Sequence, residues 1–140
     1  MAPVVDTYRK AIAIIDFWNS IENAGQPPAA WFPDSFFASG CQLTLNNGPT
    51  GDLLEIMSGF KMRPISKRFV VESATPNCAS GWIQLKIHSS YVDHADETNS
   101  VSYSQLYTFC FDEAGKVSHY IIMNDARDMG RFAEAMAPIE

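Results

Sequence analysis

The chain has 140 residues, 46% of them hydrophobic and 12% aromatic, with a formal net charge of −6 at pH 7. This length predicts a single domain over residues 1–140, and the apolar fraction is sufficient for a hydrophobic core. The acidic balance argues against nucleic acid or an anionic membrane as the main partner. No apolar run approaches the length of about 18 residues that spans a membrane, and no secretion signal is visible, so we expect a cytoplasmic protein.

Four elements are expected in the first half of the chain: an amphipathic helix over residues 6–23, one or two helical turns over 31–38, a strand over 40–45 and a helix over 51–61 capped by Thr50. Apolar residues between Tyr8 and Ile21 recur at helical spacing, and the following proline pair ends that helix. The Asn-Asn-Gly-Pro run after the first strand indicates a turn.

The second half of the chain is expected to form four strands and a closing helix: strands over 69–74, 82–92, 101–111 and 117–124, and a helix over 126–136. Apolar and polar residues alternate along the two longest strands, which is typical of a sheet with one buried face. The polar stretch 93–99 is predicted to be a hairpin loop. Helices first and hairpin-joined strands later predict an α+β fold with helices on one face of an antiparallel sheet.

The histidines and cysteines form no recognisable metal site or redox motif. The three cysteines lie far apart at positions 41, 78 and 110 and form no C-x-x-C pair. No H-E-x-x-H spacing and no glycine-rich nucleotide motif appears. We therefore expect neither a metal nor a cofactor.

This arrangement resembles the NTF2-like superfamily, in particular its SnoaL-like and ketosteroid-isomerase-like enzymes. The resemblance rests on the opening amphipathic helix, the segment WFPDSFFA at 31–38 leading into a strand, the NGPTG turn at 47–51, and the long strands of the second half. It implies a cone in which a curved antiparallel sheet wraps around the N-terminal helices and encloses a pocket. It also implies a homodimer formed through the outer face of the sheet.

Cofactor-free acid–base chemistry needs a side chain that can carry a proton into such a pocket. Asp125 follows the last strand, where a carboxylate at the mouth of an apolar cone would be partly removed from water. An aspartate at this boundary also serves well as the N-cap of the closing helix, and the two interpretations are not exclusive. His119 shares strand parity with Asp125 and is expected to face the pocket as a helper acid or base.

Two phenols, Tyr103 and Tyr107, lie four residues apart on one face of the strand over 101–111. They can polarise a carbonyl or hold an alkoxide, although the same spacing also fits plain packing, since Phe109 continues the stripe. Their order before Asp125 is similar to that in fungal natural-product isomerases such as the brevianamide semipinacolase. That enzyme uses a glutamate where this chain has an aspartate, and its arginine near the second helix has no counterpart here.

The residues and the resemblance together predict a cofactor-independent isomerase or cyclase that acts on a hydrophobic polycyclic natural-product intermediate of secondary metabolism. Its reaction would be a semipinacol-type rearrangement or related acid–base chemistry. The substrate is expected to bind apolar side chains that line the pocket: Trp18, Trp31, Phe32, Phe36, Phe109 and Met123. Two alternatives stay open: an epoxide hydrolase or dehydratase of the same fold, and a non-catalytic ligand-binding or dimerisation module.

Overall fold

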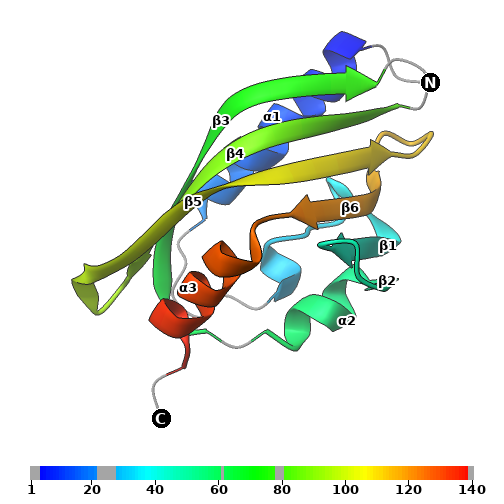
Figure 1. Cartoon of the computed structure of the whole chain (residues 1–140). Helices are drawn as coiled ribbons and strands as arrows, with labels where there is room; N and C mark the ends of the chain where they lie inside the picture. Colours follow the sequence, from blue (N-terminus) through cyan, green and yellow to red (C-terminus); the bar gives the residue numbers. More distant parts are fainter. Residues whose placement is uncertain (1–3, 22–27, 61, 78–80, 139–140) are drawn as a thin grey trace.

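The computed structural model describes residues 4–21, 28–60, 62–77 and 81–138 (Figure 1). Its elements in chain order are α1 (Val4–Ser20), the short 3-10 helix η1 (Pro28–Ala30), β1 (Phe37–Leu45), β2 (Thr50–Asp52), α2 (Leu53–Ser58), β3 (Ile65–Asn77), β4 (Trp82–Asp93), β5 (Asp96–Phe111), β6 (Val117–Met123) and α3 (Ala126–Met136). The closing helix α3 has the bounds that the sequence predicts.

The six strands form one curved sheet in the order β2-β1-β6-β5-β4-β3. Helix α1 crosses one face of its long strands, and α3 lies beside β5 at the other end (Figure 1). This arrangement confirms the predicted α+β cone. One pair departs from the antiparallel pattern, because β1 runs parallel to β6. The two strands are far apart in sequence, so local patterning carries no sign of their pairing.

The first half differs from the prediction at its helices. Residues 31–38 make a single turn, in which the Pro33 carbonyl accepts the Phe37 N–H at 2.9 Å, and β1 already begins at Phe37. Residues 50–52 pair with β1 as β2, so α2 is much shorter than expected. Its N-cap is Asp52 rather than Thr50, since the Asp52 carboxylate accepts the Glu55 N–H at 3.0 Å.

The hairpin between β4 and β5 is tighter than predicted. Pairing continues to Asp93 and resumes at Asp96, which removes most of the loop expected over 93–99. Side-chain hydrogen bonds make this polar stretch regular, because the Asp93 carboxylate accepts the Ala95 N–H and the Asp96 carboxylate accepts the Thr98 N–H. The strand expected over 69–74 also extends in both directions, to the bounds of β3.

Trp18 occupies the centre of the core. Its indole is 3% exposed, and its Nε1–H donates to the Trp31 carbonyl at 2.7 Å. Six aromatic rings lie with their centroids 5.7–6.3 Å from that of Trp18: Phe32, Phe37, Phe69, Tyr107, Phe109 and Tyr120. The indole therefore joins α1 to both halves of the sheet.

Lys67 of β3 closes the C-terminal end of α1. Its ammonium group donates to the Trp18 carbonyl and lies 4.1 Å from the centroid of the Trp31 ring. Burial lowers the pKa of Lys67 to about 8. A cation beside the last carbonyls of a helix stabilises that helix. These contacts give Lys67 a structural role at the end of α1.

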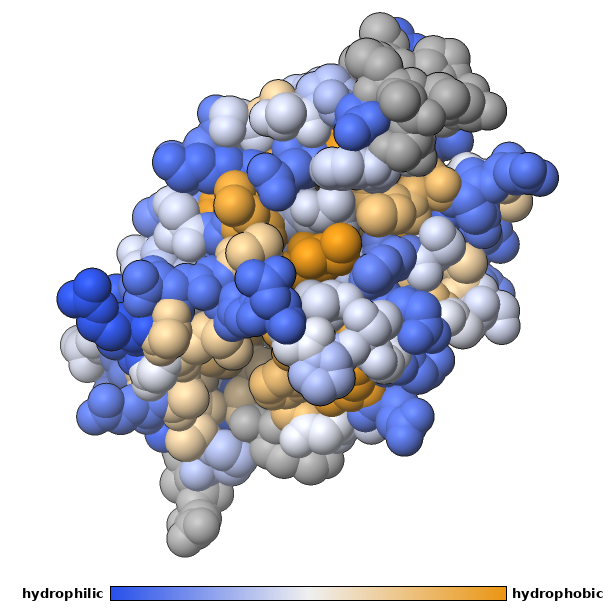
Figure 2. Space-filling view, turned by 45° about the vertical axis from the view of Figure 1, so that its right-hand side comes forward, coloured by the Kyte–Doolittle hydropathy of each residue, from blue (hydrophilic) through white to orange (hydrophobic). Residues whose placement is uncertain are grey.

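Polar residues cover most of the face shown in Figure 2, with apolar patches between them. The large hydrophobic side chains that reach the surface in the described part of the chain come from α1, from α2 and the residues after it, and from β3: Tyr8, Leu54, Phe60, Met62 and Val70. No helix within the described ranges is long and apolar enough to cross a membrane.

Candidate functional site

Hydroxyl groups gather on the inner face of the sheet, inside the cone. Alternation along β4 and β5 turns one set of side chains inward, and β6 adds one more. We call the following five residues the hydroxyl cluster: Ser89, Tyr91, Tyr103, Tyr107 and Tyr120. Each is at most 9% exposed. Four of the chain's five tyrosines thus lie in one buried group.

The side-chain amide of Gln105 lies among these hydroxyls. Its Nε2 atom is 2.6 Å from Ser89 Oγ, 2.9 Å from Tyr107 Oη and 3.1 Å from Tyr91 Oη. Gln105 is itself 5% exposed. The cluster is therefore organised around a hydrogen-bond donor that is held out of water.

The phenols remain protonated over the physiological pH range. Burial is the first cause in each case, and it raises the pKa of Tyr91 and Tyr103 and sets the pKa of Tyr107 and Tyr120 well above the usual value for a phenol. A neutral phenol donates a hydrogen bond and does not act as a base. The cluster can thus stabilise negative charge on an oxygen atom inside the cone.

The structure brings Tyr103 and Tyr107 into one cluster and joins them through Tyr91. The Tyr91 hydroxyl interacts with both of the other phenols. The rings of Tyr91 and Tyr103 are 5.8 Å apart, and the rings of Tyr107 and Tyr120 are 5.4 Å apart. The packing interpretation of the tyrosine pair therefore describes the rings, and a role of the hydroxyls toward a substrate oxygen stays a prediction.

Most of the aromatic residues predicted to bind substrate lie close together, as packed core residues. Phe32 is T-shaped on Phe37, and Phe109 is stacked on Tyr120 at 5.2 Å. Phe36 packs on Phe17 at 5.5 Å. With Trp18 and the half-buried Trp31, these side chains occupy the space between α1 and the sheet, where the sequence predicts a pocket.

Asp125 lies outside the hydroxyl cluster. It is the N-cap of α3, where its carboxylate accepts the Arg127 N–H at 2.7 Å, and its side chain is 56% exposed. It also lines a surface hollow of about 410 Å³ with Lys86, Leu106 and Met123. These contacts support the capping interpretation, while a catalytic role for Asp125 stays a prediction.

The expectation that His119 faces the pocket is wrong, and the reason is an irregularity in β6. Cys110 pairs with His119 whereas the next residue of β5 pairs with Val117, so the alternation in β6 shifts by one position. Val117 and Tyr120 therefore point inward, and His119 lies on the outer face with its Nε2 2.8 Å from Thr44 Oγ1. Met123, expected to bind substrate inside the cone, also points away from the buried Tyr120 and toward the surface hollow.

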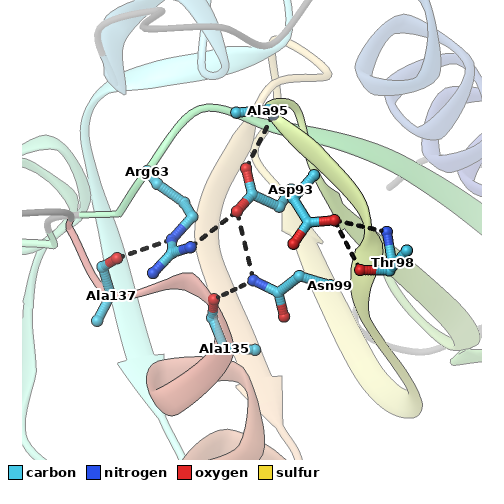
Figure 3. Close-up of polar contacts among 8 residues, drawn as sticks. Arg63, Asp93, Ala95, Thr98, Asn99, Ala135 and Ala137 are labelled. Carbon is cyan, nitrogen blue, oxygen red and sulfur yellow. Dashed lines mark hydrogen bonds and ion pairs between the residues drawn. The ribbon is translucent and has the colours of Figure 1, made fainter.

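A buried carboxylate that the sequence did not single out is found at the end of β4. Asp93 is 3% exposed and accepts hydrogen bonds from Arg63 Nη1 at 2.7 Å and from Asn99 Nδ2 at 3.4 Å (Figure 3). The Arg63 hydrogen bond, followed by the Ala95 N–H, holds the pKa of Asp93 below its usual value. Its position thirty residues from Arg63 explains why spacing alone could not reveal this pair.

The side chains that bind Asp93 also donate hydrogen bonds to the C-terminal end of α3. Arg63 Nε donates to the Ala137 carbonyl at 2.9 Å, and Asn99 Nδ2 donates to the Ala135 carbonyl at 2.8 Å (Figure 3). Donors at helix-terminal carbonyls stabilise that end of a helix. Phe132 then packs on Tyr91 at 4.7 Å, so α3 covers the hydroxyl cluster at the open end of the cone.

Within the part of the chain that the structure describes, no group of three His, Cys, Asp or Glu side chains is arranged to hold a metal ion. Cys41 is buried, and burial raises the pKa of its thiol to about 12. That thiol is therefore protonated at neutral pH and is a weak metal ligand.

Solved structures of similar shape support the fold. The BvnE pinacolase from Penicillium brevicompactum aligns with a TM-score of 0.68 and 11% identity, over 94% of this chain and 90% of that one. A SnoaL-like protein from Jannaschia sp. CCS1 aligns with a TM-score of 0.67 and 12% identity, over 99% and 98% of the two chains. No protein-family model and no curated protein matches the sequence.

The chain therefore has the NTF2-like fold shared by SnoaL-like and ketosteroid-isomerase-like proteins, which confirms the fold that the resemblance implies. A de novo designed protein with a curved β-sheet aligns as well, with a TM-score of 0.61 and 9% identity over 96% of this chain and 97% of that one. Since a designed protein shares the shape, the activity must be argued from the side chains inside the cone.

Proposed function

We propose that the protein is a cofactor-independent isomerase or cyclase that acts on a hydrophobic polycyclic natural-product intermediate. The observation that carries this proposal is the hydroxyl cluster around Gln105, a group of buried donors in an otherwise aromatic interior. Such donors favour a reaction in which negative charge develops on a carbonyl oxygen or on a C=N nitrogen of the substrate.

Tyr107 and Tyr103 are the residues proposed to donate to the acceptor atom of the substrate, a carbonyl oxygen or a C=N nitrogen, with Tyr91 as a further donor. All three belong to the cluster, and their raised pKa values keep them protonated. A semipinacol-type 1,2-shift of a 3-hydroxyindolenine fits these donors. The migrating carbon breaks its bond to C3 and forms a bond to C2, and the C3 hydroxyl becomes a carbonyl as its proton passes to water. The ring nitrogen takes a proton as its C=N bond becomes C–N, so the product is an isomer of the substrate. The proposal includes entry past α3, which covers this end of the cone, and a homodimer through the outer face of the sheet.

A non-catalytic ligand-binding module is the second candidate. Dense aromatic packing around Trp18 and the exposed position of Asp125 favour it, because they leave the interior full and the predicted base in solvent. The two candidates differ in whether the phenolic hydroxyls change the rate of a reaction or only the affinity for a ligand.

Replacing Tyr107 by Phe tests the proposal, with Tyr8→Phe as the matched control because Tyr8 is 45% exposed and outside the cluster. The substrates are 2,3-disubstituted 3-hydroxyindolenines, whose 1,2-shift gives isomers of unchanged mass that liquid chromatography separates. We expect Tyr107→Phe to lower the rate about 100-fold, as for the loss of one oxyanion donor, and Tyr8→Phe to keep the wild-type rate. Equal rates in both variants would contradict the role of the cluster. Saturable binding of the substrates without any isomer would favour the second candidate.

A further inference from the structure

A chain of three side-chain amides connects the hydroxyl cluster to an exposed turn. Asn46 follows β1 at the surface, Asn124 follows β6, and Gln105 lies inside the cone. Asn46 Nδ2 is 2.9 Å from Asn124 Oδ1, and Asn124 Nδ2 is 2.9 Å from Gln105 Oε1. Each amide presents one donor and one acceptor end, so each one constrains the orientation of the next.

A backbone group fixes the direction of the whole chain. The Asn124 N–H donates to Asn46 Oδ1 at 2.7 Å, and a backbone N–H can only donate. The oxygen of Asn46 must therefore face that N–H, which turns its Nδ2 toward Asn124 Oδ1. Asn124 in turn directs its Nδ2 to Gln105 Oε1, and Gln105 is left with Nε2 facing the hydroxyls. The orientation of the buried amide thus follows from hydrogen bonding at the surface.

This direction decides how many donors the cluster holds. When Nε2 faces the cluster, its two amide protons go to hydroxyl oxygens, and the five hydroxyl protons are left to donate to one another or to a ligand. Reversal of the Gln105 amide would remove both amide donors and add an oxygen with two lone pairs. That oxygen would then take up as many as two of the five hydroxyl protons, which would leave fewer of them for a ligand.

We propose that Asn46 and Asn124 are positioning residues that hold the Gln105 amide with its Nε2 toward the hydroxyl cluster. The cluster thereby selects ligands that present an acceptor atom, such as a carbonyl oxygen or the C=N nitrogen of an indolenine, over ligands that present only hydrogen-bond donors. This inference rests on the proposed function for its ligand class, while the orientation of the amides stands on the geometry alone.

A single exposed substitution, Asn46→Asp, reverses the chain if this inference is correct. Aspartate keeps an oxygen for the Asn124 N–H but offers a second oxygen to Asn124, which must then present its Nδ2. Asn124 Oδ1 would face Gln105, whose Nε2 would turn away from the phenols. Asn46 has a left-handed φ of 50°, a conformation that aspartate also adopts readily.

NMR of the uniformly 15N,13C-labelled full-length protein without ligand reports the orientation of the amide directly. In the wild type we expect the Gln105 amide protons to show stronger NOEs to the Tyr107 ring than to the Asn124 side chain, and in Asn46→Asp we expect this ratio to invert. Asn124→Asp is the second variant, because its carboxylate also faces Gln105 Oε1 and leaves Asn46 intact. The matched control is Asn47→Asp, which makes the same charge change at the neighbouring exposed residue of φ 61°.

Turnover of the hydroxyindolenines separates this inference from the proposed function. Inverted NOEs with an approximately 100-fold loss of rate, and neither change in Asn47→Asp, would support both. Inverted NOEs at an unchanged rate would support the amide chain and overturn the catalytic role of the cluster. An unchanged NOE ratio in the Asn46→Asp and Asn124→Asp variants would overturn the amide chain, whatever the rate.

Discussion

Trp18 offers the sharpest test of how the cone is held together. Trp18→Phe keeps an aromatic ring on α1 but removes the indole N–H and part of the ring volume. The Trp31 carbonyl then loses the hydrogen bond that the indole donates at 2.7 Å. The six rings around the indole would have to shift to fill the vacated volume, and any volume that they do not fill remains as a cavity.

Two contributions set the expected cost. Loss of the hydrogen bond to a partly buried carbonyl costs about 1 kcal/mol. Trp18 is 3% exposed, so the smaller phenyl ring leaves a buried volume that its neighbours fill only in part. This cavity costs about 1–3 kcal/mol more. The total free energy of unfolding should fall by about 2–4 kcal/mol, which for a domain of this size lowers Tm by about 6–15 °C.

Urea titration and thermal melts followed by circular dichroism measure this change. Trp82→Phe is the matched control, since Trp82 is a half-buried residue at the start of β4. Its replacement should cost less than about 1 kcal/mol. Equal losses in the two variants would refute the reasoning, because Trp18 would then contribute no more than a tryptophan at the edge of the fold.

Two further predictions concern carboxylates. Asp125→Ala should destabilise the protein by about 1 kcal/mol in urea titrations whereas Asp125→Asn should have little effect, because asparagine also accepts the Arg127 N–H as an N-cap; equal losses in both variants would contradict the capping role. Arg63 lowers the pKa of Asp93, so the stabilisation by this pair is present above the usual carboxyl pKa and is lost as pH falls through the lower folded value. Asp93→Asn should flatten the fall of stability below about pH 4 in urea titrations, and the exposed Asp96→Asn should leave that fall as in the wild type.

The local sequence pattern predicts two kinds of element: a helix with its own capping residue, and a strand with one buried face. The bounds of α3 can be predicted from the sequence because Asp125 is a strong N-cap and the apolar strand ends immediately before it. The inward face of β5 was also correct, since strict alternation places Tyr103 and Tyr107 on the same side. The cap of α3 and the alternation of β5 are each local patterns, because each depends on residues that are close together in the chain.

The errors arose where a distant strand sets the local geometry. The short strand β2 forms because β1 is beside it, and this pairing displaces the first turn of the predicted helix. The alternation of β6 shifts because of its irregular register against β5, so His119 and Tyr120 exchange the faces that counting would assign. The residues of β6 alone do not predict its register against β5.

The sequence by itself determined the class of fold, the aromatic character of the interior and the side of β5 on which two phenols lie. Those properties depend on composition and on backbone periodicity, which are local. The tertiary structure decided that Tyr91 and Tyr120 join the same cluster, that Gln105 lies among their hydroxyls, and that Asp125 stays in solvent. These facts depend on how strands far apart in the chain are paired, because hydrogen bonds between side chains form only where the register brings their atoms within about 3 Å.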